Sequence, residues 1–247
     1  MSLSGHTAFI TGAGQGIGKA CALTFASRGA NLILTDKNED SLTDVASQVA
    51  RAGTRVSQYH LDLSDLEKLD ELGEEIWKKA SIDILVNNAG FDRPGTTTKI
   101  DKKGFNEVFA IHVTVPLTLI QLFLPGMQAA GWGRIINISS IYGLIGGKGE
   151  VAYSTAKAGV IGLTKSVAKE SGQYGVTVNA LLPGLIRTPT IESFMAEKYK
   201  HQIIADTALG RIGEPEEVAR VVAFLASEDA SFITGITLPV SGGCGVL

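Results

Sequence analysis

The sequence predicts an α/β protein built on a doubly wound, seven-stranded parallel sheet with helices on both faces. Short runs of β-branched and aliphatic residues alternate with helical patterns along the whole chain, which is the order expected of a parallel sheet. Most of these runs are continuously apolar, as strands covered on both faces are. A glycine-rich turn over residues 11–18 joins the first run to the first helical pattern. Together these observations favour a Rossmann-type sheet.

The expected elements follow one another in regular order. Seven strands are expected, at Thr7–Thr11, Asn31–Asp36, Arg55–Leu61, Ile82–Asn87, Arg134–Ser139, Thr177–Leu182 and Ile236–Val240. Six helical segments are expected with them, at Ile17–Ser27, Glu39–Arg51, Leu66–Lys79, Lys103–Ala130, Val151–Tyr174 and Glu216–Ser227. Ser64 is the expected N-cap of the third helix.

No linker, repeat or low-complexity tract divides the chain, so residues 1–247 are interpreted as a single domain. Residues 188–213 are the one irregular stretch and carry only a weak helical periodicity. A segment of that length in a compact domain is often a lid over a site. We therefore expect a substrate lid at 188–213, with a peripheral helical insertion as the alternative.

Composition is that of an ordinary globular protein and excludes several classes. Hydrophobic residues make up 45% and charged residues 19% of the chain, and the net charge is −3. Intrinsic disorder is excluded, and nothing resembles the clustered Lys and Arg of a nucleic-acid binder. The most apolar stretch, near Val113–Met127, is interrupted by Pro116, Gln121 and Pro125. It is interpreted as a buried helix and not as a membrane span.

The two cysteines, Cys21 and Cys244, lie at opposite ends of the chain and lack the spacing of metal ligands. Two thiols without a disulfide framework are typical of a reducing compartment. The N-terminus runs directly into the first expected strand, and no signal peptide is visible. We expect a cytoplasmic protein without a metal site.

The glycine-rich turn predicts a phosphate-binding site. Its glycines, Gly12, Gly14, Gly16 and Gly18, would let the backbone turn sharply and approach a pyrophosphate at the N-terminus of a helix. The strict G-x-G-x-x-G pattern is not met, because Ile17 stands where the third glycine would be. By itself the turn could be purely structural.

Asp36 makes the dinucleotide interpretation stronger and predicts NAD as the cofactor. It ends the second expected strand, eighteen residues after Gly18, where an acid can accept hydrogen bonds from the adenosine ribose. The same carboxylate would repel the 2′-phosphate of NADP by about 1–4 kcal/mol at roughly 4 Å. Gln15 and Lys37 offer little fixed charge against it. The alternative for Asp36 is a solvated carboxylate at a strand end.

A catalytic site is predicted by three further residues. Tyr153 and Lys157 stand at i and i+4, on one face of the helix expected at 151–174. An ammonium beside a phenol lowers the pKa of the phenol, and a shift from ~10 to ~7 needs about 4 kcal/mol, which Lys157 and a bound nicotinamide cation could supply together. Ser140 ends the fifth expected strand, which delivers its hydroxyl to the carboxyl edge of the sheet. Ligands bind at that edge in doubly wound folds.

With these residues the chain resembles the compact short-chain dehydrogenase/reductase family over nearly its whole length. The resemblance includes the turn Thr11 to Gly18, Asp62, Asn87-Asn88-Ala89-Gly90, Ser140, Tyr153-x-x-x-Lys157, Pro183-Gly184 and Ser241-Gly242-Gly243. It implies that Ser140 binds a carbonyl oxygen, that Tyr153 is the acid/base, and that Lys157 holds the nicotinamide ribose. It also implies a homotetramer built through the two longest helices.

The resemblance further implies a set of cofactor contacts. Asp62 and Leu63 would meet the adenine, Asn88, Ala89 and Gly90 would line the central groove, and Ile186 and Thr188 would clasp the carboxamide and phosphates. With the residues above, the expected cofactor set is Gly12, Gln15, Gly16, Ile17, Gly18, Asp36, Asp62, Leu63, Asn88, Ala89, Gly90, Tyr153, Lys157, Pro183, Gly184, Ile186 and Thr188.

One position departs from the family pattern. Where the family usually has an asparagine in a proton relay behind the lysine, this chain has His112. An imidazole can donate and accept, so it could maintain the relay with a different geometry. The alternative is a buried structural histidine, with the relay carried by backbone and water.

The substrate expected is a secondary alcohol or its ketone. The chain looks most like 3-oxoacyl-(acyl-carrier-protein) reductases, which stay the alternative, but those usually prefer NADPH and dock an acidic carrier with arginines. Gly131 and Tyr174 stand at the matching positions, and docking without those charges would lose its steering. The resemblance places Arg93, Tyr142, Leu144, Lys148 and Glu150 near the pocket, with Ile191, Phe194 and Met195 in the lid. Glu150 and Lys148 would either bind a polar group of the substrate or form a solvated pair.

A further hypothesis for the function is a non-catalytic protein that binds the nucleotide. Such proteins usually lose the tyrosine or the lysine, whereas this chain has both together with Ser140. An enzyme is therefore the interpretation that the residues favour.

Overall fold

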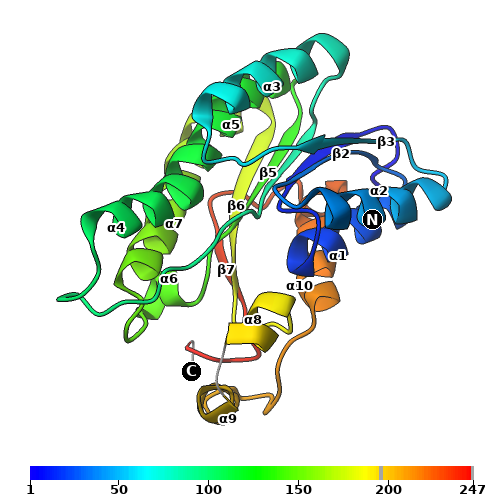
Figure 1. The fold of residues 1–247 in the computed structure, drawn as a ribbon. Helices are drawn as coiled ribbons and strands as arrows, with labels where there is room; N and C mark the ends of the chain where they lie inside the picture. Colours follow the sequence, from blue (N-terminus) through cyan, green and yellow to red (C-terminus); the bar gives the residue numbers. More distant parts are fainter. Residues whose placement is uncertain (195–196, 246–247) are drawn as a thin grey trace.

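The computed structural model describes residues 1–194 and 197–245 and confirms the predicted sheet (Figure 1). Seven parallel strands lie in the order β3-β2-β1-β4-β5-β6-β7. Their bounds are β1 Thr7–Thr11, β2 Asn31–Asp36, β3 Val56–His60, β4 Ile84–Asn87, β5 Gly133–Ile138, β6 Val176–Pro183 and β7 Thr237–Val240. The observed strand ends differ from the predicted ones by two residues at most.

Helices cover both faces of this sheet (Figure 1). On one face lie α1 (Gly16–Ser27), α2 (Glu39–Arg51) and α10 (Pro215–Leu225), and on the other α3 (Leu66–Lys79), α5 (Val115–Ala130) and α7 (Val151–Ser171). Strand β1 joins the two cores, because Ala8 and Ile10 pack against the first set while Phe9 packs against the second. Side chains alternate along a strand, so an apolar strand supplies both layers.

The order of the strands creates a switch point between β1 and β4. These two strands are neighbours, with Ala8 opposite Ile84, yet the chain leaves β1 toward one end of the sheet and β4 toward the other. The segments that follow them therefore diverge, and a crevice at the carboxyl edge is where doubly wound folds bind ligands. Both predicted cofactor segments, residues 12–18 and 88–90, begin at this point.

The helix expected over Lys103–Ala130 is not one regular α-helix. It consists of α4 (Lys102–Phe109), one π-helical turn (Ala110–Thr114) and α5. Pro116 has no N–H to donate to the carbonyl of His112, so the ordinary helical bond cannot form there. The N–H of Val115 instead bonds to the carbonyl of Ala110, five residues earlier. Such π turns occur often at functional sites.

By length and apolar composition, the segment Lys102–Ala130 would also suit a membrane span. In this fold α5 packs on α3 and on strand β5, and α4 packs on α7. The apolar residues Leu119, Ile120 and Phe123 are buried against the sheet. The helix thus has a packing role inside the fold.

The stretch 188–213 contains more regular structure than its weak periodicity indicates. Helices α8 (Pro189–Phe194) and α9 (Glu197–Ala205) both lie in it, below the carboxyl edge of the sheet in Figure 1. Its two ends are tied together, since the N–H of Arg187 donates to the carbonyl of Gly213 at 2.8 Å. We use the name "cover" for residues 187–213.

Three smaller elements differ from expectation. Helix α6 (Tyr142–Ile145) and the short turns at Gly172–Tyr174 and Glu228–Ala230 lie outside or at the ends of the predicted helices. The N-cap of α3 is Asp65, whose side chain accepts from the N–H of Lys68 at 3.2 Å, and not Ser64 as expected. Ser64 is engaged elsewhere, because its N–H and hydroxyl both donate to Asp62.

Candidate active site

The glycine-rich turn forms a cradle with no room for side chains. A Cβ atom at Gly18 would overlap the carbonyl oxygen of Gly12, and one at Gly12 would lie 2.9 Å from the backbone of Ala89. Gly12 and Gly16 have φ values of +62° and +54°, which L-residues rarely adopt. The turn therefore offers backbone N–H groups at the start of α1, an arrangement that suits a pyrophosphate. The residues present fit a dinucleotide.

A set of hydrogen bonds holds this turn against the segment after β4. The side-chain amide of Asn88 donates to the carbonyls of Thr11, at 2.9 Å, and Gly12, at 3.1 Å. In return, the hydroxyl of Thr11 accepts from the N–H groups of Asn88 and Ala89, both at 2.9 Å. The two halves of the crevice are thus positioned by Thr11, a residue outside the predicted site set.

Asp36 lies beside the turn, as predicted, and both of its carboxylate oxygens are engaged. Oδ2 accepts from the N–H of Gly14 and Oδ1 from the N–H of Asn38, each at 2.9 Å. A Cβ at Gly14 would lie 3.0 Å from Asp36 Oδ2. Each oxygen has a second lone pair, so ribose hydroxyls could still donate to this carboxylate.

The other predicted cofactor residues surround the same crevice. Asp62 accepts from the N–H and hydroxyl of Ser64, which hold the pKa of its carboxyl below the usual value. Leu63 is buried after it. Across the crevice, a Cβ at Gly16 would lie 3.0 Å from the methyl group of Thr188, so the cover begins directly over the turn.

The remaining members of that set are structural neighbours of the crevice. Gln15 is exposed at the N-cap of α1, and Ile17 packs partly against the core. Ile186 is buried and bridges to Gly213. Pro183 ends β6, and a Cβ at Gly184 would lie 2.8 Å from the backbone of Ser241.

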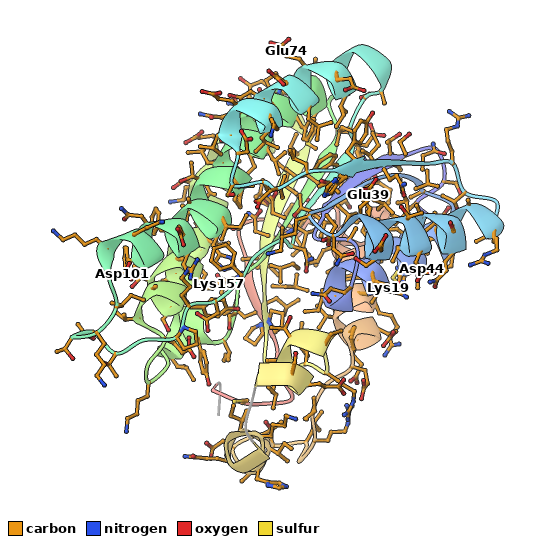
Figure 2. The ribbon with its side chains drawn as sticks, in the orientation of Figure 1. Lys19, Glu39, Asp44, Glu74, Asp101 and Lys157 are labelled. Atoms are coloured by element: carbon orange, nitrogen blue, oxygen red, sulfur yellow. The ribbon has the colours of Figure 1, made fainter. Side chains whose placement is uncertain are left out.

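Ser140, Tyr153 and Lys157 come together as predicted. Ser140 follows β5, and its hydroxyl accepts from the N–H of Tyr142 at 3.2 Å. Lys157 points inward from α7 (Figure 2) and donates from Nζ to the carbonyl of Ile138 at 2.8 Å. Nζ lies 5.4 Å from the centre of the Tyr153 ring.

Several neighbouring groups and burial set the pKa values of Tyr153 and Lys157. Burial raises the pKa of Tyr153, with smaller increases from Asp92 and Glu150, while the Ser140 hydroxyl lowers it. Burial also lowers the pKa of Lys157 to about 7, so the amine is only partly charged at neutral pH. The residues around Tyr153 therefore favour the neutral phenol.

His112 lies in the π turn, and its exposed fraction is only 3%. Its Nε2 is 2.9 Å from the carbonyl of Phe91, and a carbonyl only accepts, so Nε2 carries the hydrogen and Nδ1 is an acceptor. Burial and the nearby Lys157 lower the pKa of His112 well below its usual value. The ring lies edge-on to Tyr153, with centres 5.3 Å apart.

The imidazole ring of His112 leaves room only for a glycine at position 90. A Cβ at Gly90 would overlap the imidazole of His112. The glycine after β4 thus leaves space for the ring, and the ring in turn holds the carbonyl of Phe91. The segment after β4 is therefore tied to the π turn as well as to the glycine-rich turn.

Some residues at the site were not among the predicted site residues. Asn137 joins β5 to its neighbours, because it accepts from Asn87 at 2.8 Å and donates to Thr164 on α7 at 2.9 Å. No periodicity marks these polar side chains, although each lies next to a predicted motif.

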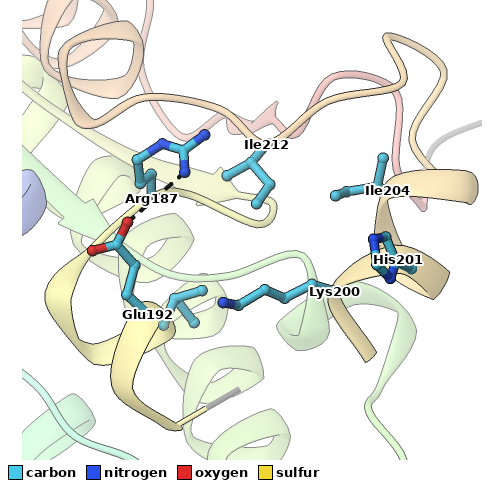
Figure 3. A pocket seen from close by; sticks show the side chains of 7 residues that line it. Arg187, Glu192, Lys200, His201, Ile204 and Ile212 are labelled. Carbon is cyan, nitrogen blue, oxygen red and sulfur yellow. Dashed lines mark ion pairs between the residues drawn. The ribbon is translucent and has the colours of Figure 1, made fainter. Parts of the chain in front are cut away.

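The cover encloses a hollow of its own, between α8, α9 and the return segment at Ile212 (Figure 3). Isoleucines and basic groups line it, and Arg187 is paired with Glu192 and, at 3.0 Å, with Glu214.

Ile191, a predicted lid residue, belongs to this lining. The side chain of Phe194 and all of Met195 lie outside the described residues. Leu144 and Lys148 are exposed on the segment before α7.

A family model described as "Enoyl-(Acyl carrier protein) reductase" matches residues 12–245. The 3-oxoacyl-[acyl-carrier-protein] reductase FabG of Thermotoga maritima is 37% identical over 244 residues, which are 98% of this chain and 99% of the relative. The protein of the same name from Aquifex aeolicus is 41% identical over 248 residues, covering 98% of each chain.

Solved structures agree with this match. A candidate NAD(P)-dependent gluconate 5-dehydrogenase from Beutenbergia cavernae, with bound NADP at low occupancy, superposes with a TM-score of 0.93. It is 36% identical, and the alignment covers 98% of this chain and 97% of that one. A candidate short-chain alcohol dehydrogenase from Sinorhizobium meliloti has the same TM-score and coverage at 28% identity. The chain belongs to the short-chain dehydrogenase/reductase family, whose members are oxidoreductases that bind a nicotinamide cofactor.

Proposed function

We propose that this protein transfers a hydride between NAD(H) and a secondary alcohol or its ketone, with Tyr153 as the acid/base. One observation carries the proposal, namely that Tyr153 lies with Lys157 Nζ 5.4 Å from its ring centre and close enough to Ser140 for that hydroxyl to lower its pKa. Two hydroxyls so placed can bind one substrate oxygen and exchange its proton. Bound NAD⁺ would accept the hydride and would bring a positive charge toward Tyr153.

Asp36 supports NAD as the preferred cofactor. Its carboxylate already binds the glycine-rich turn through Gly14, so a 2′-phosphate there would meet a fixed negative charge. The nearest basic residue in sequence, Lys37, lies with Nζ 5.9 Å from the ring centre of Phe91. Such a repulsion is worth about 1–4 kcal/mol at roughly 4 Å.

His112 supports a proton route behind Lys157. Lys157 uses one donor on Ile138, and an ammonium has two more. His112 offers a buried acceptor at Nδ1 on the same side as Tyr153 and Lys157. We assign it the relay role, through water and either this nitrogen or its backbone carbonyl.

A 3-oxoacyl-(acyl-carrier-protein) reductase is the second candidate, because the curated relatives have that name. Against it stand Asp36 and the carrier-docking positions, where Gly131 lacks a side chain and Tyr174 is a half-exposed uncharged residue. We further propose a cytoplasmic homotetramer that associates through α4–α5 and α7. Free Cys21 and Cys244 are compatible with that compartment.

The test is a panel of neutral secondary alcohols with NAD and NADP near pH 9, and acetoacetyl thioester reduction with NADH and NADPH. We expect alcohol oxidation with NAD to dominate. Strong NADPH preference combined with rapid thioester reduction would instead establish the carrier-protein reductase. Binding of NADH without turnover across the panel would establish a non-catalytic nucleotide-binding protein.

A further inference from the structure

Lys157 is held through both its side chain and its main chain by two consecutive residues where β5 ends. Its Nζ donates to the carbonyl of Ile138 at 2.8 Å, and its own carbonyl accepts from the hydroxyl of Ser139, also at 2.8 Å. One lysine is thus bonded in opposite directions to the same stretch of strand. We call these two hydrogen bonds the lysine clasp.

The bond from Ser139 is not one that the helix needs for itself. Lys157 lies inside α7, where each carbonyl already accepts from the N–H four residues later. A carbonyl oxygen has a second lone pair, and the hydroxyl of Ser139 uses it. Ser139 and Lys157 are only 2% and 4% exposed, so water does not compete for this bond. Its effect is therefore to set where α7 lies relative to β5.

The strand side of the clasp is fixed by the sheet. The N–H of Ser139 donates to the carbonyl of Leu181 on β6 at 2.7 Å, and the N–H of Ile141 donates to the carbonyl of Pro183 at 3.1 Å. Ser140 lies between these two bonds, so the residue proposed to bind the substrate oxygen has the same support. The clasp therefore links the position of α7 to the strand end that carries Ser140.

The turn that follows Ser140 packs on the clasp. A Cβ at Gly143 in α6 would lie 2.7 Å from the carbonyl carbon of Lys157 and 2.9 Å from its carbonyl oxygen. Only a glycine allows the turn to approach the helix so closely. The N–H of Gly143 donates to the carbonyl of Ser140 at 2.9 Å. The main chain of Lys157, the turn and Ser140 thus form one packed unit.

A second anchor between β5 and α7 lies farther along the helix. Asn137 donates to the hydroxyl of Thr164 at 2.9 Å, from the same side of β5 as Ser139, because side chains alternate along a strand. Thr164 is seven residues after Lys157 and eleven after Tyr153, or about 10 and 16 Å along the helix. The bond from Ser139 therefore controls the part of α7 that carries the two proposed catalytic side chains.

We propose that Ser139 is a positioning residue, whose hydroxyl fixes Lys157 to the end of β5 and so sets the spacing between Ser140 on the strand and Tyr153 on the helix. Because this hydroxyl is bonded to the main chain of α7, it acts through Lys157 and not on the substrate. The kinetic consequence rests on the proposed function, but the clasp does not.

The kinetic test compares two substitutions that each remove one buried hydroxyl from a main-chain carbonyl of α7. Ser139→Ala breaks the clasp, and Ser171→Ala, the matched control, breaks the bond of Ser171 to the carbonyl of Val167 near the other end of the helix. For Ser139→Ala we expect kcat with saturating NAD to fall about tenfold, while KM for the alcohol stays within about twofold. Ser171→Ala should change neither constant by more than about twofold.

Ser139→Thr keeps the hydroxyl and should retain most of kcat. An unchanged kcat in Ser139→Ala, or equal losses in the two alanine variants, would overturn the positioning role. A folded Ser139→Thr enzyme as slow as Ser139→Ala would overturn it as well. If the added methyl group prevents folding, the comparison of the two alanine variants decides.

The second test detects the clasp without any turnover, by amide hydrogen exchange of the cofactor-free protein. In Ser139→Ala we expect the amides of residues 155–161 to exchange about two- to tenfold faster than in wild type, with those of residues 167–171 unchanged. Ser171→Ala should give the reverse pattern. Equal exchange of residues 155–161 in wild type and Ser139→Ala would overturn the clasp, even if the enzyme oxidises alcohols as proposed. The expected local change in a protein that oxidises no alcohol would support the clasp and refute only the proposed function.

Discussion

Ser140, Tyr153 and Lys157, which we call the catalytic wall, and the cover both follow the carboxyl ends of strands, and they are built in opposite ways. On the wall, Ser140 and Lys157 are buried and bonded to main-chain groups. On the cover, Arg187 is exposed and is held by ion pairs with Glu192 and Glu214. Exposed ion pairs contribute about 0–1 kcal/mol each to the free energy of folding. Hydrogen bonds to buried main-chain groups break only when the surrounding fold rearranges.

This difference indicates a division of tasks. Chemistry depends on the relative positions of a few atoms, and the wall takes these positions from strand β5 and helix α7. Substrate selection depends on the shape and charge at the entrance of a site, and we propose that the short helices of the cover, with their exposed side chains, supply these. We therefore expect wall substitutions to change kcat and cover substitutions to change mainly KM.

The largest effect is expected on the wall. Tyr153→Phe removes the hydroxyl whose pKa Ser140 lowers, so kcat should fall by about 10²–10⁴-fold with little change in melting temperature. Steady-state kinetics with NAD, together with a thermal melt, check this. Retention of more than a tenth of the activity would refute the acid/base role of Tyr153.

The next largest effect is expected at the cofactor end. Asp36→Asn removes the charge beside Gly14, and the ratio of kcat/KM for NADPH to that for NADH should rise by about tenfold or more. The matched control is Asp44→Asn, because Asp44 lies on the outer side of α2, where it pairs with Lys19 at 3.6 Å (Figure 2). Equal changes in the two variants would show that net charge, and not the position of Asp36, governs the preference.

A smaller effect is expected behind the wall. His112→Ala leaves the backbone carbonyl of the π turn in place, so kcat should fall about tenfold or less, far less than for Tyr153→Phe. His112→Asn, which can still hydrogen-bond, should lose less than His112→Ala. The measurement is kcat as a function of pH for both variants. Losses as large as that of Tyr153→Phe would instead make His112 a full member of the catalytic group.

The smallest effect is expected on the cover. Ile191→Ala removes apolar surface from the lining of the hollow between α8 and α9, and KM for an alcohol should rise about tenfold or less at nearly constant kcat. Glu192→Gln, on the same helix, is the control for loss of an ion pair. A fall in kcat with unchanged KM would place the cover in the chemical step and remove the division proposed above.

The residues with a strong local signal were predicted correctly. Hydrophobic runs located most of the strands, because a strand covered on both faces has to be apolar along its length, whereas the edge strand β3 is mostly polar and exposed. The positions of Asp36 and Ser140 followed from this, since each ends a strand and all parallel strands end at the same edge. Here local pattern and global fold agree, so sequence alone was sufficient.

Other features depend on partners far away in the chain and had no local signal. Burial raises the pKa of Tyr153 and lowers that of Lys157, and it is made by side chains from many parts of the chain. The cap of α3 was assigned one residue too early, because Asp62 captures the donors of Ser64. The π turn was missed, although Pro116 lies four residues after His112.

The sequence by itself determined the sheet, the glycine cradle and the identities of Ser140, Tyr153 and Lys157, because periodicity and short-range spacing encode them. Only the tertiary structure decided what surrounds Tyr153. It placed His112 against the carbonyl of Phe91 and bridged Gly95 to Glu150. Burial and charge are sums over all neighbours in space, and these two residues, 55 positions apart, become neighbours only when the loops after β4 and before α7 close on each other.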